Sequence, residues 1–324
     1  MQVDMTNHQE VDSNEFRFNG KGSQLLGIML LNTLLSIITF GIYYPWARVN
    51  RLKFFWENAS LNGSPFVFHG TGKELFKGFI KVLLFIGIFY GLLLYAKLSG
   101  NLGLYFITLL AFLIALVFII PLAIHGAMRY RLSRTSWRGI HFGYRGSRVQ
   151  LITDFFIGCI LTVITFGIYN SWFVNRLRTY IIGNIRFGNL RFGYDGSGTE
   201  LFAIKLKSFI FSIFTFGIYY FWYLEQWTNY YINHCYIEQN GERYYFTGRL
   251  KGSGYFMLII SNLLMSIFTL GLATPWVIIR TTHFIIRNME IPADINFNNI
   301  AQTEDEFKDA AGDDLIDFFD LGIV

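Results

Sequence analysis

Long runs without charged residues alternate along this chain with shorter segments in which aromatic, polar and basic residues mix. The charge-free runs cover residues 24–46, 82–96, 98–128, 155–175, 208–224 and 252–279. A helix of about 20 apolar residues is long enough to cross the hydrocarbon core of a bilayer. The pattern therefore predicts a membrane protein with several spanning helices, and it excludes a soluble enzyme and a secreted disulfide scaffold.

Four of these runs share a motif centred on a glycine. Residues 38–43 and 164–169 both read ITFGIY, residues 214–219 read FTFGIY, and residues 268–273 read FTLGLA. A tryptophan follows each glycine five positions later. The repeated glycines and tryptophans are Gly41, Trp46, Gly167, Trp172, Gly217, Trp222, Gly271 and Trp276. Four copies at fixed offsets indicate an internally repeated structure.

A second shared element precedes the helical runs. It reads FRFNGKGSQL from Phe16, FVFHGTGKEL from Phe66, IHFGYRGSRVQL from Ile140 and LRFGYDGSGTEL from Leu190, and a degenerate copy starts at Tyr244. Alternating aromatic and polar residues followed by glycines predict a short strand and a turn. A serine or threonine three positions before Glu or Gln, as in Thr71–Glu74, then predicts a capped helix start.

We therefore expect an all-α polytopic membrane protein with about six transmembrane helices, built on a strand, glycine turn and helix repeat, with short β-hairpins in the loops. The expected segments are an acidic tail (1–15), a repeat copy with span 1 (16–78), inserted spans 2 and 3 (79–128), repeat copies with spans 4, 5 and 6 (129–189, 190–243 and 244–302), and an acidic tail (303–324).

A second arrangement of the repeats stays open. Six alternating spans would divide the Lys and Arg residues almost evenly between the two sides of the membrane. If each repeat instead turns back within the membrane, 26 of the 27 bases can be cytoplasmic and only Lys97 lies outside, which agrees better with the positive-inside tendency. The segment after Trp46 has one apolar face and looks like a surface-lying helix, so we favour six full spans.

The motifs resemble a known family. FxFxGxGxEL ahead of a run that ends in ITFGIYYPW is similar to the YjgN-type bacterial inner-membrane proteins, whose domain has no assigned function. The resemblance covers roughly residues 16 to 320. It implies a multi-pass protein of the inner membrane of a Gram-negative bacterium, and it supplies no catalytic residues.

Each repeated run carries a stripe of polar residues on one face of the expected helix. These residues are Asn32, Ser36, Thr39, Thr162, Thr165, Ser208, Ser212, Thr215, Asn262, Ser266 and Thr269. Three interpretations remain open. The stripe can mediate helix packing, because small and hydroxyl side chains bond across helix interfaces. It can line a solute path, or its hydroxyls can bond to carbonyls of their own helix.

Catalytic and metal-binding signals are missing from the sequence. The six histidines and two cysteines show no metal-ligand spacing, and no nucleophile motif or cofactor fingerprint is present. Net charge is +5, but the last 22 residues carry −7, so the rest carries +12. The bases are spread over separate loops, which argues against nucleic-acid binding and favours contact with the lipid bilayer.

Two functional classes follow. The first is transport of a small solute or lipid through an interior lined by the repeats. The second is a non-transport envelope scaffold or membrane-organising protein that acts through its interfacial aromatic segments and acidic tail. Four arginines just after a span, Arg129, Arg131, Arg134 and Arg138, form a candidate site for an anionic lipid.

Overall fold

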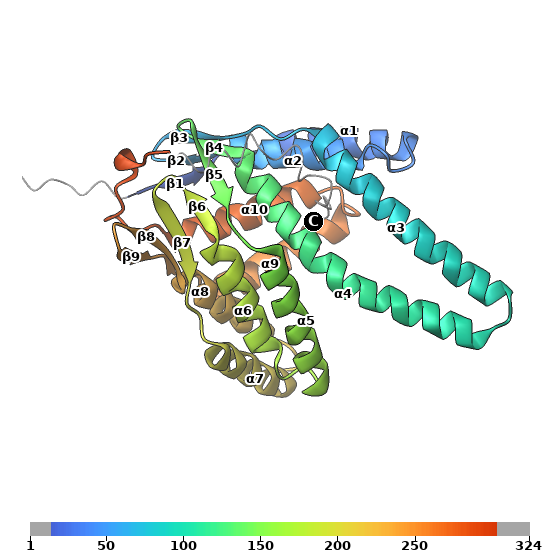
Figure 1. The fold of residues 1–324 in the computed structure, drawn as a ribbon. Helices are drawn as coiled ribbons and strands as arrows, with labels where there is room; N and C mark the ends of the chain where they lie inside the picture. Colours follow the sequence, from blue (N-terminus) through green and yellow to red (C-terminus); the bar gives the residue numbers. More distant parts are fainter. Residues whose placement is uncertain (1–13, 303–324) are drawn as a thin grey trace, which may run out of the picture.

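The computed structural model describes residues 14–302, so the predicted acidic tail 303–324 and all of the predicted tail 1–15 except Asn14 and Glu15 lie outside the described residues. Strands and helix pairs alternate along the chain in one repeated order: two strands, a helix that leaves the sheet, and a helix that returns to it. Figure 1 shows the strands together on the left, with the helix pairs extending from them to the right and downward.

The helices form five antiparallel pairs. The pairs are α1 (Gly22–Ile38) with α2 (Tyr44–Glu57), α3 (Gly72–Leu98) with α4 (Leu102–Ser133), α5 (Arg148–Ile164) with α6 (Asn170–Gly183), α7 (Gly198–Phe214) with α8 (Tyr220–Asn233), and α9 (Gly252–Phe268) with α10 (Thr274–Arg287). Each helix contacts the next along the chain, and α10 contacts α1. The helices therefore close into a ring.

The strands form a nine-stranded antiparallel meander in chain order. Its strands are β1 (Phe16–Phe18), β2 (Ala59–Leu61), β3 (Ser64–Phe68), β4 (Thr135–Trp137), β5 (Ile140–Tyr144), β6 (Ile185–Phe187), β7 (Leu190–Tyr194), β8 (Cys235–Gln239) and β9 (Glu242–Tyr245). A separate pair joins β10 (Thr247–Gly248) to β11 (Met289–Glu290), and a short 3-10 helix follows at Phe297–Asn299. Hairpins of successive repeats pair with one another, as Phe142 of β5 does with Phe187 of β6.

The main hydrophobic core lies where the strands meet the inner ends of the helices. Trp137 and Leu190 are fully buried there, and Phe187, Ile237 and Phe297 pack around them. Its members come from nearly every repeat and from the segment after β11. This end of the helical ring is therefore filled with side chains.

Two features differ from the sequence prediction. The protein is not all-α, because the short hairpins join edge to edge into one sheet. The six full spans are also not confirmed. The runs predicted as spans 1, 4, 5 and 6 each break at the repeat glycine, and the chain returns along the helix that it has just left.

The predicted spans 2 and 3 correspond to α3 and α4. In the part of the chain that the structure describes, these two helices are long and apolar enough to cross a membrane. At 1.5 Å per residue, the 27 residues of α3 extend over about 40 Å, whereas the 17 residues of α1 cover only about 26 Å. The α3–α4 pair consequently projects farthest from the sheet (Figure 1).

Candidate membrane-embedded site

The repeat glycine forms the turn at the outer end of each short helix pair. In the first pair, Phe40 and Gly41 both have left-handed backbone, with φ of 50° and 87°. Glycine adopts this region at little cost, whereas a β-branched residue does not. The Gly41 N–H donates to the Ser36 carbonyl at 2.7 Å, and the same bond recurs in the three other copies. The motif TFGIY is therefore a helix-ending turn.

The side chain of the repeat threonine forms hydrogen bonds to the backbone before and after this turn. The Thr39 hydroxyl donates to the Leu35 carbonyl at 2.7 Å and accepts from the Tyr43 N–H at 3.0 Å. Both bonds recur at the other repeat threonines, Thr165, Thr215 and Thr269. One hydroxyl thus satisfies the end of the outgoing helix and the start of the returning helix. Of the three interpretations, bonding to local backbone is the one seen for these residues.

Two of the remaining stripe residues, Asn32 and Asn262, bond across the two helices of a pair. Asn32 is buried, donates to the Ala47 carbonyl at 3.2 Å and accepts from Asn50 at 3.0 Å. Asn262 donates to Thr281 in the same way at 3.3 Å. Ser208 is buried. The Thr162 hydroxyl donates to the Gly158 carbonyl. The backbone carbonyls of Ser212 and Ser266 accept hydrogen bonds from the N–H groups of the turn glycines. Packing between paired helices is thus seen for Asn32 and Asn262, whereas Thr162 bonds to a carbonyl of its own helix.

A valine at Thr165 tests the capping role. The T165V chain loses the acceptor for the Tyr169 N–H, and we expect a loss of about 1–2 kcal/mol in the free energy of unfolding. T162V in the same helix is the matched control, because the Thr162 hydroxyl bonds only to a carbonyl of its own helix. We expect less than about 0.5 kcal/mol there. Denaturant titration in micelles measures both, and equal losses would contradict the capping role.

The turns present apolar side chains at the outer ends of the short pairs. Phe40, Phe166 and Phe216 are 97% exposed and Leu270 is 93% exposed. The turn between α3 and α4 is different, since Lys97, Ser99 and Asn101 stand there beside the exposed Leu98 and Leu102. Four turns thus have an apolar tip, whereas the fifth combines a charged and two polar side chains with apolar ones.

The repeat tryptophans join neighbouring helix pairs. Trp46 packs against Gly72 at the start of α3, and Trp172 and Trp222 pack in the same way against Gly198 and Gly252. Trp276 of the last pair packs against Gly22 of the first, which closes the ring. At the one junction without this tryptophan, Leu122 follows Pro121 and the next helix begins with Arg148 instead of glycine. Tryptophan therefore packs against glycine at four of the five junctions between the described helix pairs.

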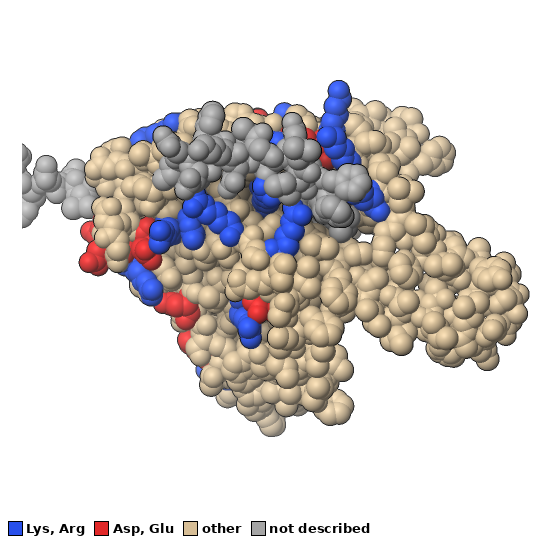
Figure 2. Space-filling model, viewed as in Figure 1, with Lys and Arg blue, Asp and Glu red and all other residues tan. Residues whose placement is uncertain are grey.

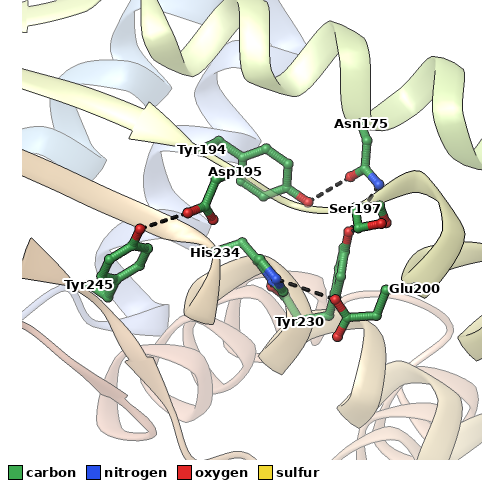
Figure 3. Close-up of polar contacts among 8 residues, drawn as sticks. All are labelled: Asn175, Tyr194, Asp195, Ser197, Glu200, Tyr230, His234 and Tyr245. Carbon is green, nitrogen blue, oxygen red and sulfur yellow. Dashed lines mark hydrogen bonds and ion pairs between the residues drawn. The ribbon is translucent and has the colours of Figure 1, made fainter. Parts of the chain in front are cut away.

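A buried polar network that we did not predict from the sequence joins the third and fourth pairs (Figure 3). The Tyr194 hydroxyl donates to Asn175 at 2.7 Å, Asn175 donates to the Tyr230 hydroxyl at 2.9 Å, and Tyr230 donates to the Ser197 carbonyl at 2.6 Å. Beside it, the Glu200 Oε2 atom lies 3.4 Å from the His234 Nε2 atom. The recurrence of tyrosine at positions 130, 180 and 230 was the available sequence signal.

This network is structural in character. Burial raises the pKa of Tyr194 above its usual value, so its phenol remains a neutral donor to Asn175. Burial also raises the pKa of the nearby Cys235 thiol to about 11, which keeps the sulfur protonated and weakly nucleophilic at neutral pH. Within residues 14–302, no group of His, Cys, Asp and Glu side chains could hold a metal ion.

The four arginines predicted to bind an anionic lipid do not form one open patch. Arg134 pairs with Glu74 at 3.0 Å. Arg138 lies over the Trp137 ring at 4.3 Å and donates to Ser64 and Asn298. Arg131 is only partly exposed on α4. Arg134 and Arg138 are thus engaged in holding the strands and helices together.

The charged surface is uneven. Figure 2 shows Lys and Arg side chains over the sheet and the adjoining helix ends, whereas the outer half of the α3–α4 pair and the lower ends of α5 and α7 carry none on this face. The first charged residue after each repeat glycine comes seven to nine positions later, at Arg48, Arg176, Glu225 and Arg280. Each short pair therefore has an uncharged outer end.

Comparisons with known proteins place the chain in a family and relate it to inner membrane proteins. A model of the family described as "Bacterial protein of unknown function (DUF898)" matches residues 13–196 and 226–318. The inner membrane protein YjgN of Salmonella typhimurium is 36% identical over 170 residues, which cover 52% of this chain and 40% of the relative. The YjgN protein of Escherichia coli K12 is 26% identical over 216 residues, which cover 56% of this chain and 52% of the relative.

The chain thus spans about half the length of the curated relatives that it matches. No solved structure matches it. The family model nevertheless covers most of the sequence, including the strands of the sheet and the first three helix pairs, and it leaves out α7 and the start of α8. The chain belongs to this bacterial family of unknown function, and it is a protein of the bacterial inner membrane.

Proposed function

We propose that this protein binds and organises phospholipid in one leaflet of the inner membrane. In this arrangement the α3–α4 pair crosses the bilayer, and the four shorter pairs enter the leaflet next to the sheet. The observation that carries the proposal is the contrast between four turns whose apolar tip residue is at least 93% exposed and one turn, at the end of the long pair, that carries Lys97, Ser99 and Asn101. Only the long pair is built to reach water on the far side.

The depth of insertion follows from the position of charge. Seven to nine residues separate the repeat glycine from the first charged residue of the returning helix, which corresponds to roughly 10 Å along a helix. Half of a hydrocarbon core is about 15 Å thick. The short pairs can therefore bury their uncharged ends in a single leaflet without taking a charged side chain to the bilayer centre.

The side of insertion follows from the distribution of bases. Because every short pair returns to the sheet, connectivity within residues 14–302 assigns all Lys and Arg residues except Lys97 to the sheet side. Basic residues accumulate on the cytoplasmic side of inner-membrane proteins. We infer that the sheet is cytoplasmic. The second arrangement considered in the sequence analysis thus receives more support than six alternating spans.

Solute transport through the ring receives less support. The end of the ring at the sheet is filled by a core around Trp137 and Phe187. The repeat threonines use their hydroxyls in turns and so do not present a free polar face to a solute. Apolar ends of helix pairs, in contrast, displace and contact acyl chains wherever they enter a leaflet.

The variant F40S/F166S/F216S/L270S tests the proposed function. We expect the full-length protein, extracted in mild detergent, to retain at least twofold fewer phospholipids per molecule in native mass spectrometry, because its four turns no longer favour hydrocarbon. V67S/V149S is the control, since both valines are exposed apolar residues at the sheet end. Unchanged lipid retention in the four-site variant would overturn the proposal.

A further inference from the structure

The first helix pair contains a cavity of about 480 Å³ between α1 and α2. Its lining runs from the turn toward the sheet along both helices. The lining residues are Met29, Asn32, Thr33, Ser36, Ile37, Phe40, Gly41, Tyr44, Ala47, Arg48 and Arg51. The volume lies in the range of sites that hold small amphiphilic ligands.

The lining changes from apolar to basic along the pair. Ile37, Phe40 and Tyr44 lie at the turn, whereas Arg48 and Arg51 lie one to two helical turns farther toward the sheet. Asn32 and Ser36 contribute polar groups between these two ends. An amphiphile with an anionic head and an apolar chain matches this order of side chains.

The two arginines are peculiar to the first pair. Seven positions after the other repeat glycines stand Val174, Leu224 and Ile278 in place of Arg48. Ten positions after them stand Leu177, Trp227 and Thr281 in place of Arg51. The repeated fold therefore forms without a base at either position, and the arginines have no general structural role in the repeat.

The arginines also lack anionic partners. Among residues 14–302, no carboxylate forms an ion pair with Arg48 or Arg51. Arg48 instead lies close enough to Arg131 of α4 for their like charges to interact. A bound anion would relieve this repulsion and would accept charge-assisted hydrogen bonds from the guanidinium groups.

We infer that this cavity binds one anionic phospholipid of the inner membrane, with its phosphate at Arg48 and Arg51 and an acyl chain directed along Ile37 toward Phe40. This inference rests on the proposed function, because it needs the turn to lie in the leaflet. Arg48 follows the turn glycine by seven residues, so about 10 Å of insertion brings it to the boundary between acyl chains and headgroups.

Native mass spectrometry of the full-length protein in mixed micelles tests the site, with dioleoylphosphatidylglycerol and dioleoylphosphatidylcholine as the probes. We expect the wild-type chain to bind phosphatidylglycerol more tightly. R48Q/R51Q should weaken that binding about thirtyfold and leave phosphatidylcholine binding unchanged, because two bases near the lipid phosphate are removed. R191Q/R243Q, which removes two exposed arginines from the sheet, is the matched control and should bind like the wild type.

The outcomes separate the two proposals. Equal binding of phosphatidylglycerol by wild type and R48Q/R51Q would overturn the site, while lipid retention that depends on the turns would still support the proposed function. If neither lipid binds any variant, the proposed function fails as well. The alternative occupant of the cavity is the chain's own acidic segment, and a full-length chain with the tail substitutions D313N/D314N/D317N/D320N tests it. Should it bind phosphatidylglycerol strongly where the wild type does not, the chain's own acidic segment fills the cavity, and the lipid site is overturned.

Discussion

Replacing Trp137 with alanine is expected to lower the free energy of unfolding by about 3–5 kcal/mol, the largest single effect that we predict. The indole is fully buried, and its ring centre lies 6.1 Å from those of Phe187 and Phe297 and 6.4 Å from that of Phe66. Its N–H donates to the Ser64 carbonyl at 3.0 Å. The substitution opens a cavity where several repeats meet and leaves that carbonyl without its donor.

Denaturant titration in micelles measures this loss, and Y95A serves as the control, because Tyr95 is 66% exposed on α3. The variant also distinguishes a packed centre from a conduit. A W137A protein as stable as the wild type would contradict the filled core, and a wild-type protein that itself makes proteoliposomes permeable to a small solute would support transport through the ring. Loss of stability without a gain in permeability is the result expected from the packing.

Substituting leucine for Gly22 is expected to destabilise the closed ring by about 1–3 kcal/mol. A side chain at Gly22 would collide with the Trp276 ring, which closes the junction between the last and the first helix pairs. Gly27 lies on the same helix with no neighbour near the position that a Cβ would take. G27L is therefore the matched control, and we expect it to be close to neutral.

The junction between α4 and α5 indicates which second substitution should offset the loss of stability caused by a large side chain at Gly22. Because Leu122 and Arg148 stand there at the positions that tryptophan and glycine take elsewhere, the double variant G22R/W276L should recover part of the stability lost in G22R alone. A double-mutant cycle from thermal unfolding in micelles gives the coupling between the two positions. Additive effects would show that the first and last pairs are not matched through these side chains.

The repeat could be predicted from the sequence because its signals are local. Glycine with left-handed backbone, a capping threonine and a tryptophan at a fixed offset are all set within ten residues, so the motif was recognisable in each copy. The location of the inserted spans was equally clear. Both α3 and α4 have long apolar stretches, and hydropathy depends on nothing beyond the segment itself.

The direction of the chain after each glycine could not be decided in that way. The run 24–46 has the same composition whether the helix continues across a bilayer or reverses at Gly41. What distinguishes the two is the contact between the helices, such as the bond from Asn32 to the Ala47 carbonyl, together with the pairing of α2 to the sheet through β2. The interpretation of the stripe as a solute path depended on the same missing information.

The joining of separate hairpins into one sheet was also hidden. Each strand has only two to five residues, and its partners lie in neighbouring repeats up to about 70 residues away, as in the pairing of Phe68 with Thr135. The sequence by itself determined the membrane class and the repeated motif, because these depend on composition and on the spacing of near neighbours in the chain. Only the tertiary structure decided that the units return to one side, close into a ring through Trp276 and Gly22, and set Arg48 and Arg51 in a cavity, because these depend on contacts between distant segments.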